Sequence, residues 1–326
     1  MNIKFAVDQI KNWVFVTGVP RSGTTFVGTI LSLPLQVDYI HEPFNPSCGV
    51  PGANLWYPYL RSNTSTKDIN IEDMQRYHEL IQSIFNYDFS LKTNIPPDDS
   101  LVRKICKRIV GSRGVFHLRL AKLNPLHQSA IIKDPTGIFL TEYLYLNYGI
   151  KPVIIVRHPT SLIASLKRLD WVPNLARFHN KPHLIEDYFG DETDLLTKNW
   201  SSSIQKAAVH WKAGYKVMLQ QASKYPDWHI VTHEELSEQP VAVFHSLYEK
   251  LNLPWSESVK DKIIKLTEGN SSAKARKGRI QDFKRNSADI FSMYRQSLSS
   301  VERQEIFDIV KDVALQVYTK SSFALD

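Results

Sequence analysis

Apolar residues along the chain gather in short runs, and longer segments of mixed apolar and polar residues lie between these runs. The runs with the length and composition of buried strands are 13–17, 130–133, 153–156 and 229–232, with a weaker one at 36–40. The segments expected to be helices are 24–33, 136–148, 159–169, 196–223 and, as an amphipathic helix, 300–317. Strands that alternate with helices predict an α/β fold with three layers, in which helices cover both faces of a central parallel sheet.

Two long segments interrupt this alternation. The first, 43–129, opens with a loop rich in Pro, Gly and Asn at 44–59 and continues in polar, helix-like stretches. The second, 170–194, carries aromatic side chains among polar residues: Trp171, Phe178, Tyr188 and Phe189. Long insertions in compact domains usually form lids or binding loops. We therefore expect one domain over 1–326, in which both insertions form a ligand site or its lid.

Composition narrows the class of protein. The 326 residues are 43% hydrophobic, enough for a sizeable core, and no stretch approaches the ~20 apolar residues of a membrane span. The N-terminal segment lacks the apolar region of a secretory signal, so a cytoplasmic location is expected. Cys48 and Cys106 exclude a disulfide framework; we expect two buried free thiols, with a single bridge between them as the alternative. The eleven His show no metal-binding spacing.

The chain is basic, with 40 Lys and Arg against 33 Asp and Glu and a formal net charge of +7. This charge suits an anionic cofactor or substrate. No nucleic-acid-reading motif accompanies it, so no nucleic-acid partner is expected. The sequence indicates no oligomeric state.

The first predicted strand leads into a loop bounded by two glycines, Gly18-Val19-Pro20-Arg21-Ser22-Gly23-Thr24-Thr25. A strand followed by such a loop and a helix gathers backbone N–H groups around an anion. The spacing is that of the P-loop G-x-x-x-x-G-K-[ST], but Thr24 stands at the position of the lysine and Arg21 is the loop cation. We therefore expect the loop to bind a phosphate, but not the triphosphate tail of ATP or GTP.

A second candidate anion site follows the predicted strand 153–156. Arg157 stands where this strand meets a helix, and Ser165 follows eight residues later. An Arg beside a helical Ser can hold a phosphate through charge-assisted hydrogen bonds. A nucleotide triphosphatase more often has an acidic residue at such a strand end to organise Mg²⁺. Asp134 follows another predicted strand, but Lys133 stands between them, which weakens that alternative.

Taken together, these motifs resemble those of sulfotransferases that use 3′-phosphoadenosine 5′-phosphosulfate (PAPS). The glycine-bounded loop looks like the family's 5′-phosphosulfate loop, and Arg157 with Ser165 looks like its 3′-phosphate motif. The segment 275–279 with 282–284 resembles the late Arg-Lys-Gly segment of the family. The segment 231–236 with Pro240 resembles its Tyr-Glu-Asp-Leu strand end, although His233 replaces the Tyr. The matches appear in the family's order and extend over 14–285.

The resemblance implies a fold like that of P-loop nucleoside kinases and PAPS as the cofactor, with no metal required. It assigns the 5′-phosphosulfate to the loop and the 3′-phosphate to Arg157, Ser165 and the late basic segment. The implied cofactor-binding residues are Pro20, Arg21, Ser22, Gly23, Thr24, Thr25, Phe26, Arg157, Ser165, His233, Arg276, Lys277, Gly278 and Arg279. Arg21 is also expected to neutralise charge on the leaving phosphate. For Phe26, packing in the core is an equally good explanation.

The acceptor side is marked by Tyr39-Ile40-His41-Glu42-Pro43-Phe44, which resembles the Glu-Pro-Phe segment of carbohydrate-type sulfotransferases. The resemblance implies that Glu42 is the base that removes the acceptor's proton, with His41 as the second choice. An ordinary strand-end carboxylate paired with a Lys or Arg is the alternative. Lys133 is expected either to contact a sulfuryl oxygen or substrate, or to be solvated.

These residues favour transfer of a sulfuryl group from PAPS to a hydroxyl of a glycan or a glycan-containing molecule. A small-molecule alcohol or phenol is the alternative acceptor. A P-loop kinase or nucleotide triphosphatase that acts on a small molecule is the alternative enzyme. A nucleotide-binding module without catalytic activity is the third possibility.

Overall fold

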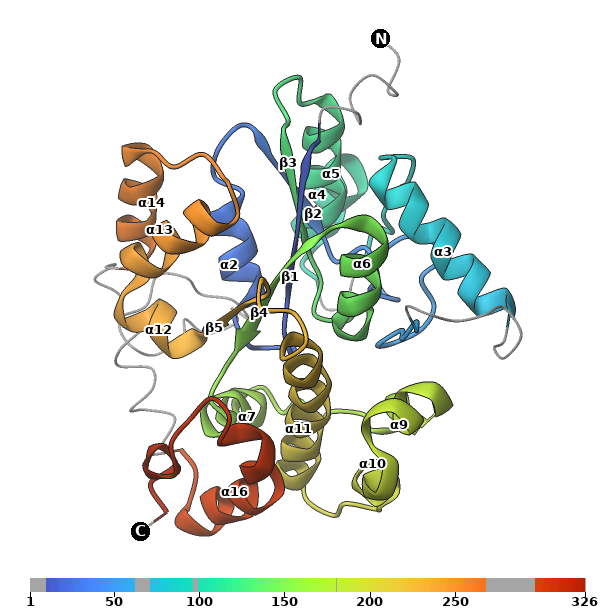
Figure 1. The fold of residues 1–326 in the computed structure, drawn as a ribbon. Helices are drawn as coiled ribbons and strands as arrows, with labels where there is room; N and C mark the ends of the chain where they lie inside the picture. Colours follow the sequence, from blue (N-terminus) through green and yellow to red (C-terminus); the bar gives the residue numbers. More distant parts are fainter. Residues whose placement is uncertain (1–9, 62–70, 96–98, 180, 268–296, 326) are drawn as a thin grey trace. The chain divides into compact units, whose positions relative to one another are not determined.

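In the computed structural model, the residues described are 10–61, 71–95, 99–179, 181–267 and 297–325. They contain a five-stranded parallel sheet flanked by helices (Figure 1). The strand order is β2-β3-β1-β4-β5, and the strands are β1 (Asn12–Thr17), β2 (Val37–His41), β3 (Ser129–Lys133), β4 (Lys151–Val156) and β5 (His229–Thr232). The predicted α/β class and all five predicted strands, the weaker one included, are thus confirmed.

The pairing register aligns two strand ends that carry candidate residues. β3 pairs with both β1 and β2, and the last pair in the β2–β3 ladder is His41 with Lys133. The backbone N–H of Glu42 then donates to the carbonyl oxygen of Lys133 at 2.8 Å, which extends the ladder by one residue. The carboxyl ends of β2 and β3 therefore hold His41, Glu42 and Lys133 side by side.

The helices include three departures from the predicted boundaries. The predicted helix 136–148 begins as a 3₁₀ turn, η1 (Ile138–Leu140), and continues as α6 (Thr141–Tyr148). The predicted helix 196–223 is two helices, α10 (Thr193–Thr197) and α11 (Ser203–Ala222). A capping box, in which Ser202 and Gln205 bond each other's backbone N–H, starts α11 at this point. The C-terminal helix, α16 (Ser300–Ala314), ends three residues before the predicted boundary.

The chain divides into two compact units. Unit 1 is Met1–Thr17, Val27–Val153 and Lys250–Pro254, and unit 2 is Gly18–Phe26, Ile154–Glu249 and Trp255–Asp326. The remaining helices of unit 1 are α3 (Ile71–Phe85), α4 (Leu101–Val110) and α5 (Arg113–Leu123), and most of α2 (Thr24–Leu31) also belongs to it. The remaining elements of unit 2 are α7 (Pro159–Arg168), α8 (Ala176–His179), α9 (Pro182–Tyr188), η2 (Gly190–Glu192), α12 (His233–Glu238), α13 (Pro240–Lys250), α14 (Glu257–Thr267) and η3 (Lys320–Phe323).

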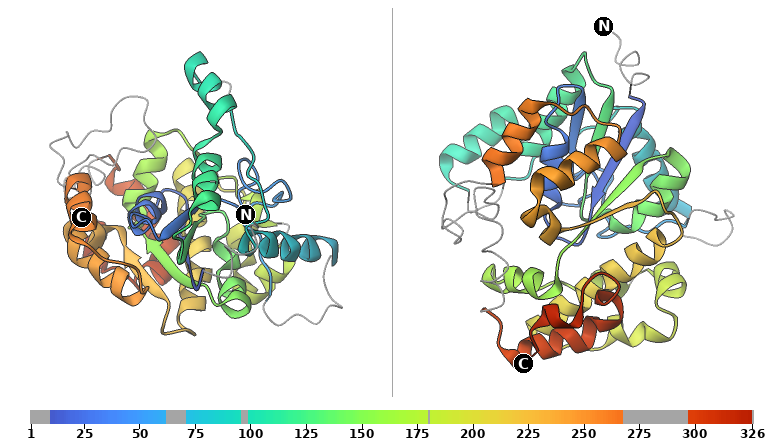
Figure 2. Two further views of the ribbon diagram at one scale, coloured as in Figure 1. Left: turned by 90° about the horizontal axis from the view of Figure 1, so that it is seen from above. Right: turned by 60° about the vertical axis from the view of Figure 1, so that its left-hand side comes forward.

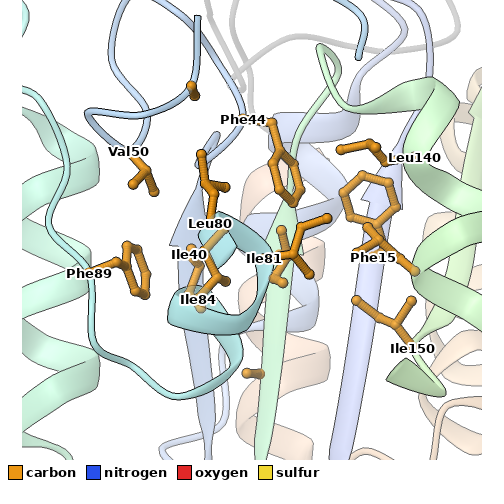
Figure 3. Packing of buried hydrophobic residues seen from close by; sticks show 14 of the residues in the cluster. Phe15, Ile40, Phe44, Val50, Leu80, Ile81, Ile84, Phe89, Leu140 and Ile150 are labelled. Carbon is orange, nitrogen blue, oxygen red and sulfur yellow. The ribbon is translucent and has the colours of Figure 1, made fainter. Parts of the chain in front are cut away.

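The insertion 43–129 is part of the core of unit 1. Figure 3 shows side chains of the sheet, of α3 and of the segment after β2 in one apolar cluster, among them Phe15, Ile81 and Phe44. The buried carboxylate of Asp38 on β2 accepts hydrogen bonds from three side chains of the insertion at 2.8 Å: Tyr87, Asn124 and His127. Apolar burial and a satisfied buried carboxylate thus hold the insertion on the sheet.

In unit 2, the central element is α11, which packs against α16 and α7 (Figure 2). Its indole donor Trp211 Nε1 bonds Arg157 O at 2.8 Å, and Tyr215 Oη bonds Ile155 O at 2.8 Å, so α11 supports the end of β4. The aromatic side chains of the insertion 170–194 belong mostly to this core: Phe178, Tyr188 and Phe189 are buried, and Trp171 is exposed. None of the helices described is both long enough and apolar enough to cross a bilayer.

Candidate active site

The glycine-bounded loop runs from the end of β1 into the first turn of α2. Ser22 N donates to Val19 O at 3.0 Å and Phe26 N donates to Gly23 O at 2.9 Å, so the loop turns tightly into the helix. Ser22, Thr24 and Thr25 are buried. Arg21 has a φ of 78°, a conformation that costs a residue other than glycine about 1–3 kcal/mol and is common at functional sites.

Both loop glycines are required by close contacts within unit 2. A Cβ on Gly18 (φ 153°) would lie 2.4 Å from Ile155 O, and a Cβ on Gly23 (φ 105°) would lie 3.0 Å from His233 Cδ2. The loop backbone therefore packs directly on the end of β4 and on the start of α12. Such a cradle of backbone around a helix N-terminus is the arrangement that binds phosphate.

Arg157 connects this loop to the rest of unit 2. The side chain is almost fully buried, and its Nη1 donates to Arg21 O at 2.9 Å. Burial and the charge of Arg157 together hold the pKa of His233 well below its usual range, so the imidazole is neutral at pH 7. The structure thus brings together three predicted cofactor-binding elements: the loop, Arg157 and His233.

The helix that follows Arg157 carries two buried serines one turn apart. The Ser161 and Ser165 hydroxyls are both buried, and neither has a hydrogen-bond partner within the described ranges. A buried hydroxyl without a partner costs roughly 1–3 kcal/mol. A phosphate oxygen would supply the missing partner, so the residues present fit the predicted 3′-phosphate. Ser165 was predicted from its spacing to Arg157, whereas Ser161 was missed, although its i, i+4 spacing to Ser165 could have revealed it.

A half-buried carboxylate, that of Glu234, holds the end of β4 and was also missed as a site residue. Glu234 Oε1 accepts from the backbone N–H of His158 at 3.2 Å, and Glu234 Oε2 accepts from Tyr318 Oη at 2.8 Å. The His158 ring shares a hydrogen bond of 2.9 Å with the hydroxyl of Ser322. Residues near the end of the chain therefore hold the residue next to Arg157 in place, a long-range contact that no local motif reveals.

Phe26 and the late basic segment are the remaining predicted cofactor-binding residues. The Phe26 ring packs on Phe244 with centroids 5.7 Å apart, which is the core packing that the sequence left open. The residues Arg276, Lys277, Gly278 and Arg279 lie outside the described part of the chain.

Glu42 is the centre of the candidate acceptor side, in unit 1. Its carboxylate forms an ion pair with the fully buried Lys133 ammonium, and its Oε2 accepts from Asn45 Nδ2 at 2.7 Å. Glu42 has a φ of 50°, so the backbone is strained at this position as it is at Arg21. Lys133 is therefore not solvated, and the pairing of Glu42 with a lysine that the sequence left as an alternative is present.

The charges around Glu42 set its protonation state. Burial alone would raise the pKa of Glu42, but the Lys133 charge and the hydrogen bonds from Lys133 and Asn45 bring it well below its usual range. Burial and the Lys133 ammonium lower the pKa of His41 to about 3. At pH 7, Glu42 is therefore a carboxylate and His41 is a neutral imidazole, which shares a hydrogen bond of 2.9 Å with Tyr39 Oη.

Asp134 is a third buried group at this strand end, and it holds the backbone after Glu42. Its Oδ2 accepts from Phe44 N at 2.7 Å, and its Oδ1 accepts from Thr136 N and Thr136 Oγ1 at 2.7 and 2.6 Å. Burial, and next the charge of Glu42, raise the pKa of Asp134 above its usual range. The sequence drew attention to Asp134 only as a possible Mg²⁺ ligand, whereas these contacts give it a structural role.

The next features are the candidate metal ligands and the two cysteines. The described residues contain no cluster of three His, Cys, Asp or Glu that could hold a metal ion. Both cysteines are free, as expected, but the expected burial is wrong because Cys106 is exposed and Cys48 is half-buried.

Comparisons with known proteins supplement this geometry. The chain matches the sequence model of the sulfotransferase family over residues 14–257. No curated protein matches it in sequence. The sulfotransferase domain from the curacin biosynthetic pathway aligns with a TM-score of 0.48 and 15% identity, covering 94% of this chain and 98% of that one.

Two further solved structures align at lower scores. Sulfotransferase STF9 from Mycobacterium avium has a TM-score of 0.42 and 12% identity, covering 90% of this chain and 79% of that one. Mouse sulfotransferase SULT7A1, crystallised with PAP, has a TM-score of 0.40 and 12% identity, covering 99% of this chain and 91% of that one.

Proposed function

The chain belongs to the sulfotransferase family, and from this premise we propose that it transfers a sulfuryl group from PAPS to a hydroxyl of an acceptor. The observation that carries the choice of donor is the second anion site of unit 2. Arg157 is buried there, and the helix after it holds two buried hydroxyls that have no hydrogen-bond partner among the residues that the structure describes. PAPS has a 3′-phosphate that ATP lacks, so a site of this kind favours PAPS over ATP.

In this proposal the loop of unit 2 holds the 5′-phosphosulfate through its backbone N–H groups and through Arg21, Ser22, Thr24 and Thr25. Arg157, Ser165 and the basic segment 276–279 hold the 3′-phosphate. When bound, PAPS supplies a sulfuryl group on a good leaving group, adenosine 3′,5′-bisphosphate (PAP). Arg21 and the loop N–H groups stabilise the negative charge that develops on the leaving phosphate.

The chain's own residues then act on the acceptor. We assign Glu42 as the base, because its position matches the Glu-Pro-Phe segment and its carboxylate is ionised at neutral pH. The ion pair with Lys133 lowers its pKa, which weakens it as a proton acceptor, so the assignment rests on its position. It accepts the hydroxyl proton as the acceptor oxygen bonds to sulfur, while the bond between sulfur and the phosphate oxygen breaks and its electron pair stays on PAP. Lys133 holds the Glu42 carboxylate in place through their ion pair.

The acceptor class and the organisation of the chain are also part of this proposal. The Glu-Pro-Phe segment favours a hydroxyl of a glycan or glycan-containing molecule. We assign the whole chain to one sulfotransferase domain in which the insertion 43–129 supplies part of the acceptor site, since Glu42 directly precedes it. A small alcohol or phenol is the alternative acceptor, and a screen with bound PAPS distinguishes the two.

The test of the donor is a calorimetric titration with PAP, ADP and ATP–Mg²⁺, repeated on Arg157→Ala. We expect PAP to bind at least tenfold more tightly than ADP, and we expect the Arg157→Ala variant to lose this preference. Equal or tighter binding of ATP–Mg²⁺ would contradict the proposal and favour a kinase.

A further inference from the structure

A segment of unit 1 that contains none of the candidate residues has a net charge equal to that of the whole protein. Its second helix, α5, packs against β2 beside His41. Residues 101–126 contain seven Lys and Arg and no Asp or Glu. The whole chain has 40 basic and 33 acidic residues, so the rest of the chain carries equal numbers of the two. Residues 101–126 are therefore one of the strongly basic segments of the chain, beside the later one at 276–279, and Lys107 is paired with Asp99 just before the segment. A basic surface element of this kind is typical of proteins that bind anionic surfaces.

The same segment exposes an unusual number of apolar side chains. Nine of the sixteen large hydrophobic side chains exposed in the described ranges belong to it: Leu101, Val102, Ile105, Ile109, Val110, Phe116, Leu120, Leu123 and Leu126. Leu101 is 73% exposed and Leu123 is 80% exposed. Single exposed apolar residues are ordinary, but a contiguous group of this size marks an interaction site.

The apolar and basic side chains of α4 lie on opposite sides of the helix. At 100° per residue, the apolar side chains of Leu101, Val102, Ile105 and Ile109 share one face, and Arg103, Lys104, Lys107 and Arg108 share the other. None of the residues of α4 is buried, and Figure 2 shows α4 projecting from the sheet of unit 1. Packing within unit 1 therefore does not explain why its apolar face is so regular.

The next helix, α5, continues the pattern while it anchors the segment. Gly114, Leu118 and Ala121 are buried on the face that packs against β2. Phe116, Leu120 and Leu123 follow at i, i+4 and i+7 on the opposite face, and all three are exposed. α5 is thus held by the core on one side and presents apolar side chains on the other.

From this charge and this exposure we infer that residues 101–126, the α4–α5 surface, bind the protein to an anionic lipid membrane. A helix with an apolar face and a Lys- and Arg-rich polar face lies in the plane of a membrane interface, where apolar side chains enter the acyl boundary and basic ones meet anionic headgroups. Both requirements are met within one 26-residue segment. A soluble acidic protein would match the charge but has no equal need for nine exposed apolar side chains.

The inference is independent of the sulfotransferase proposal, because no candidate donor or acceptor residue belongs to the α4–α5 surface. Its experiment is co-sedimentation of the full chain with vesicles of phosphatidylcholine alone and with an equal mixture of phosphatidylcholine and phosphatidylserine. We expect binding to the mixed vesicles that weakens as salt is raised, and little binding to phosphatidylcholine alone.

Two variants separate the contributions of charge and apolar contact. Arg103→Glu with Arg108→Glu is expected to lower partition into mixed vesicles by about tenfold or more. Leu101→Ser with Ile109→Ser is expected to lower it by a similar factor at constant charge. The matched controls are Lys262→Glu with Lys265→Glu on α14, and Val301→Ser on α16, which change exposed residues elsewhere and should bind as the unchanged protein does.

Several results would overturn the inference. One is that the unchanged protein fails to bind the mixed vesicles. Another is that the α4 variants and their controls lose vesicle binding equally. Concentration-dependent self-association in sedimentation velocity, abolished by Leu101→Ser with Ile109→Ser while vesicle binding is absent, would instead assign this surface to a contact between copies of the chain. Thermal melting of each variant checks that its fold is unchanged.

Discussion

Glu42 and Lys133 combine a structural and a chemical task in one ion pair. Lys133 is fully buried, so its ammonium depends on the Glu42 carboxylate for compensation of its charge. Removing one partner of such a pair leaves an uncompensated buried charge and typically costs ~3–5 kcal/mol. A loss of activity in a single Glu42 variant therefore does not by itself identify a base.

A double variant separates the two tasks. Glu42→Gln is expected to lower the free energy of unfolding by roughly 3 kcal/mol and to lower kcat with bound PAPS by ~10²–10⁴-fold. Adding Lys133→Met removes the orphaned charge, so stability should recover while kcat stays low. Urea unfolding and turnover are measured on the same preparations. If kcat recovered together with stability in the double variant, Glu42 would be only a structural partner of Lys133.

For Ser165 we predict that one substitution weakens cofactor binding without lowering stability. Its hydroxyl is buried without a partner in the described structure, so Ser165→Ala should leave the free energy of unfolding unchanged or raise it slightly. The same change removes a donor to the 3′-phosphate and should weaken PAP binding by roughly tenfold to a hundredfold, a loss of about 1.5–3 kcal/mol.

The affinity for ADP, which has no 3′-phosphate, serves as the internal control for Ser165→Ala. Calorimetry with both nucleotides checks the prediction. Equal losses for PAP and ADP would mean that Ser165 acts on the shape of the loop and not on the 3′-phosphate.

At the scale of elements, the glycine-bounded loop 18–25 is constrained by its close contact with β4. Gly18→Ala places a Cβ 2.4 Å from a backbone oxygen of β4, so the loop or the strand must shift. We expect a loss of PAP binding of at least about tenfold, together with lower stability by roughly 1–3 kcal/mol. Gly149→Ala is the matched control: it also has a positive φ, of 62°, but its Cβ would meet no atom within 4 Å.

Titration of both glycine variants with PAP checks the loop prediction. Gly149→Ala is expected to lose some stability through its φ alone and to bind PAP normally. A Gly18→Ala variant that binds PAP as tightly as the unchanged protein would show that the close approach of the loop to β4 is not needed for binding.

The elements themselves were largely predictable because their signals are local. The five strands are short apolar runs, and the observed boundaries lie within two residues of the predicted ones. The predicted helix 136–148 starts late because Asp134 Oδ1 accepts from Thr136 N and Gly137 N, which holds these residues in a turn. The predicted helix 196–223 is divided because the Ser202 capping box starts a new helix. Caps and turns decided by one side chain are the signals that composition misses.

At the scale of the whole molecule, what could not be predicted is the set of contacts that join distant segments. His41, Glu42 and Lys133 were each singled out by their position after a strand, and strand pairing then brings them together. The hydrogen bond from Tyr318 to Glu234 joins residues 84 positions apart, and no local sequence motif at either residue predicts it. The burial of the Ser161 hydroxyl likewise follows from the packing of α7, whose residues 159–166 are all buried.

The buried histidines of both units make the whole molecule sensitive to acid. Burial and the charge of Arg177 lower the pKa of His210 in unit 2 to about 4, and burial and the Lys133 charge lower that of His41 in unit 1 to about 3. In the unfolded chain both titrate near 6.5. Their contribution to stability is therefore complete above pH 6.5 and is lost as the pH falls toward these lower values.

Each of these histidines should reduce the free energy of unfolding by about 1.4 kcal/mol for every pH unit below 6.5. The raised pKa of the buried Asp134 acts in the opposite direction, because its protonation favours the folded state, and it offsets part of this loss. Urea unfolding between pH 7 and pH 5 checks the net effect, which we expect to be a loss of stability on acidification. His210→Phe removes one of these groups. The slope of the free energy of unfolding against pH should then fall by the equivalent of about one proton. A variant with the same slope as the unchanged protein would mean that His210 takes up its proton in the folded state.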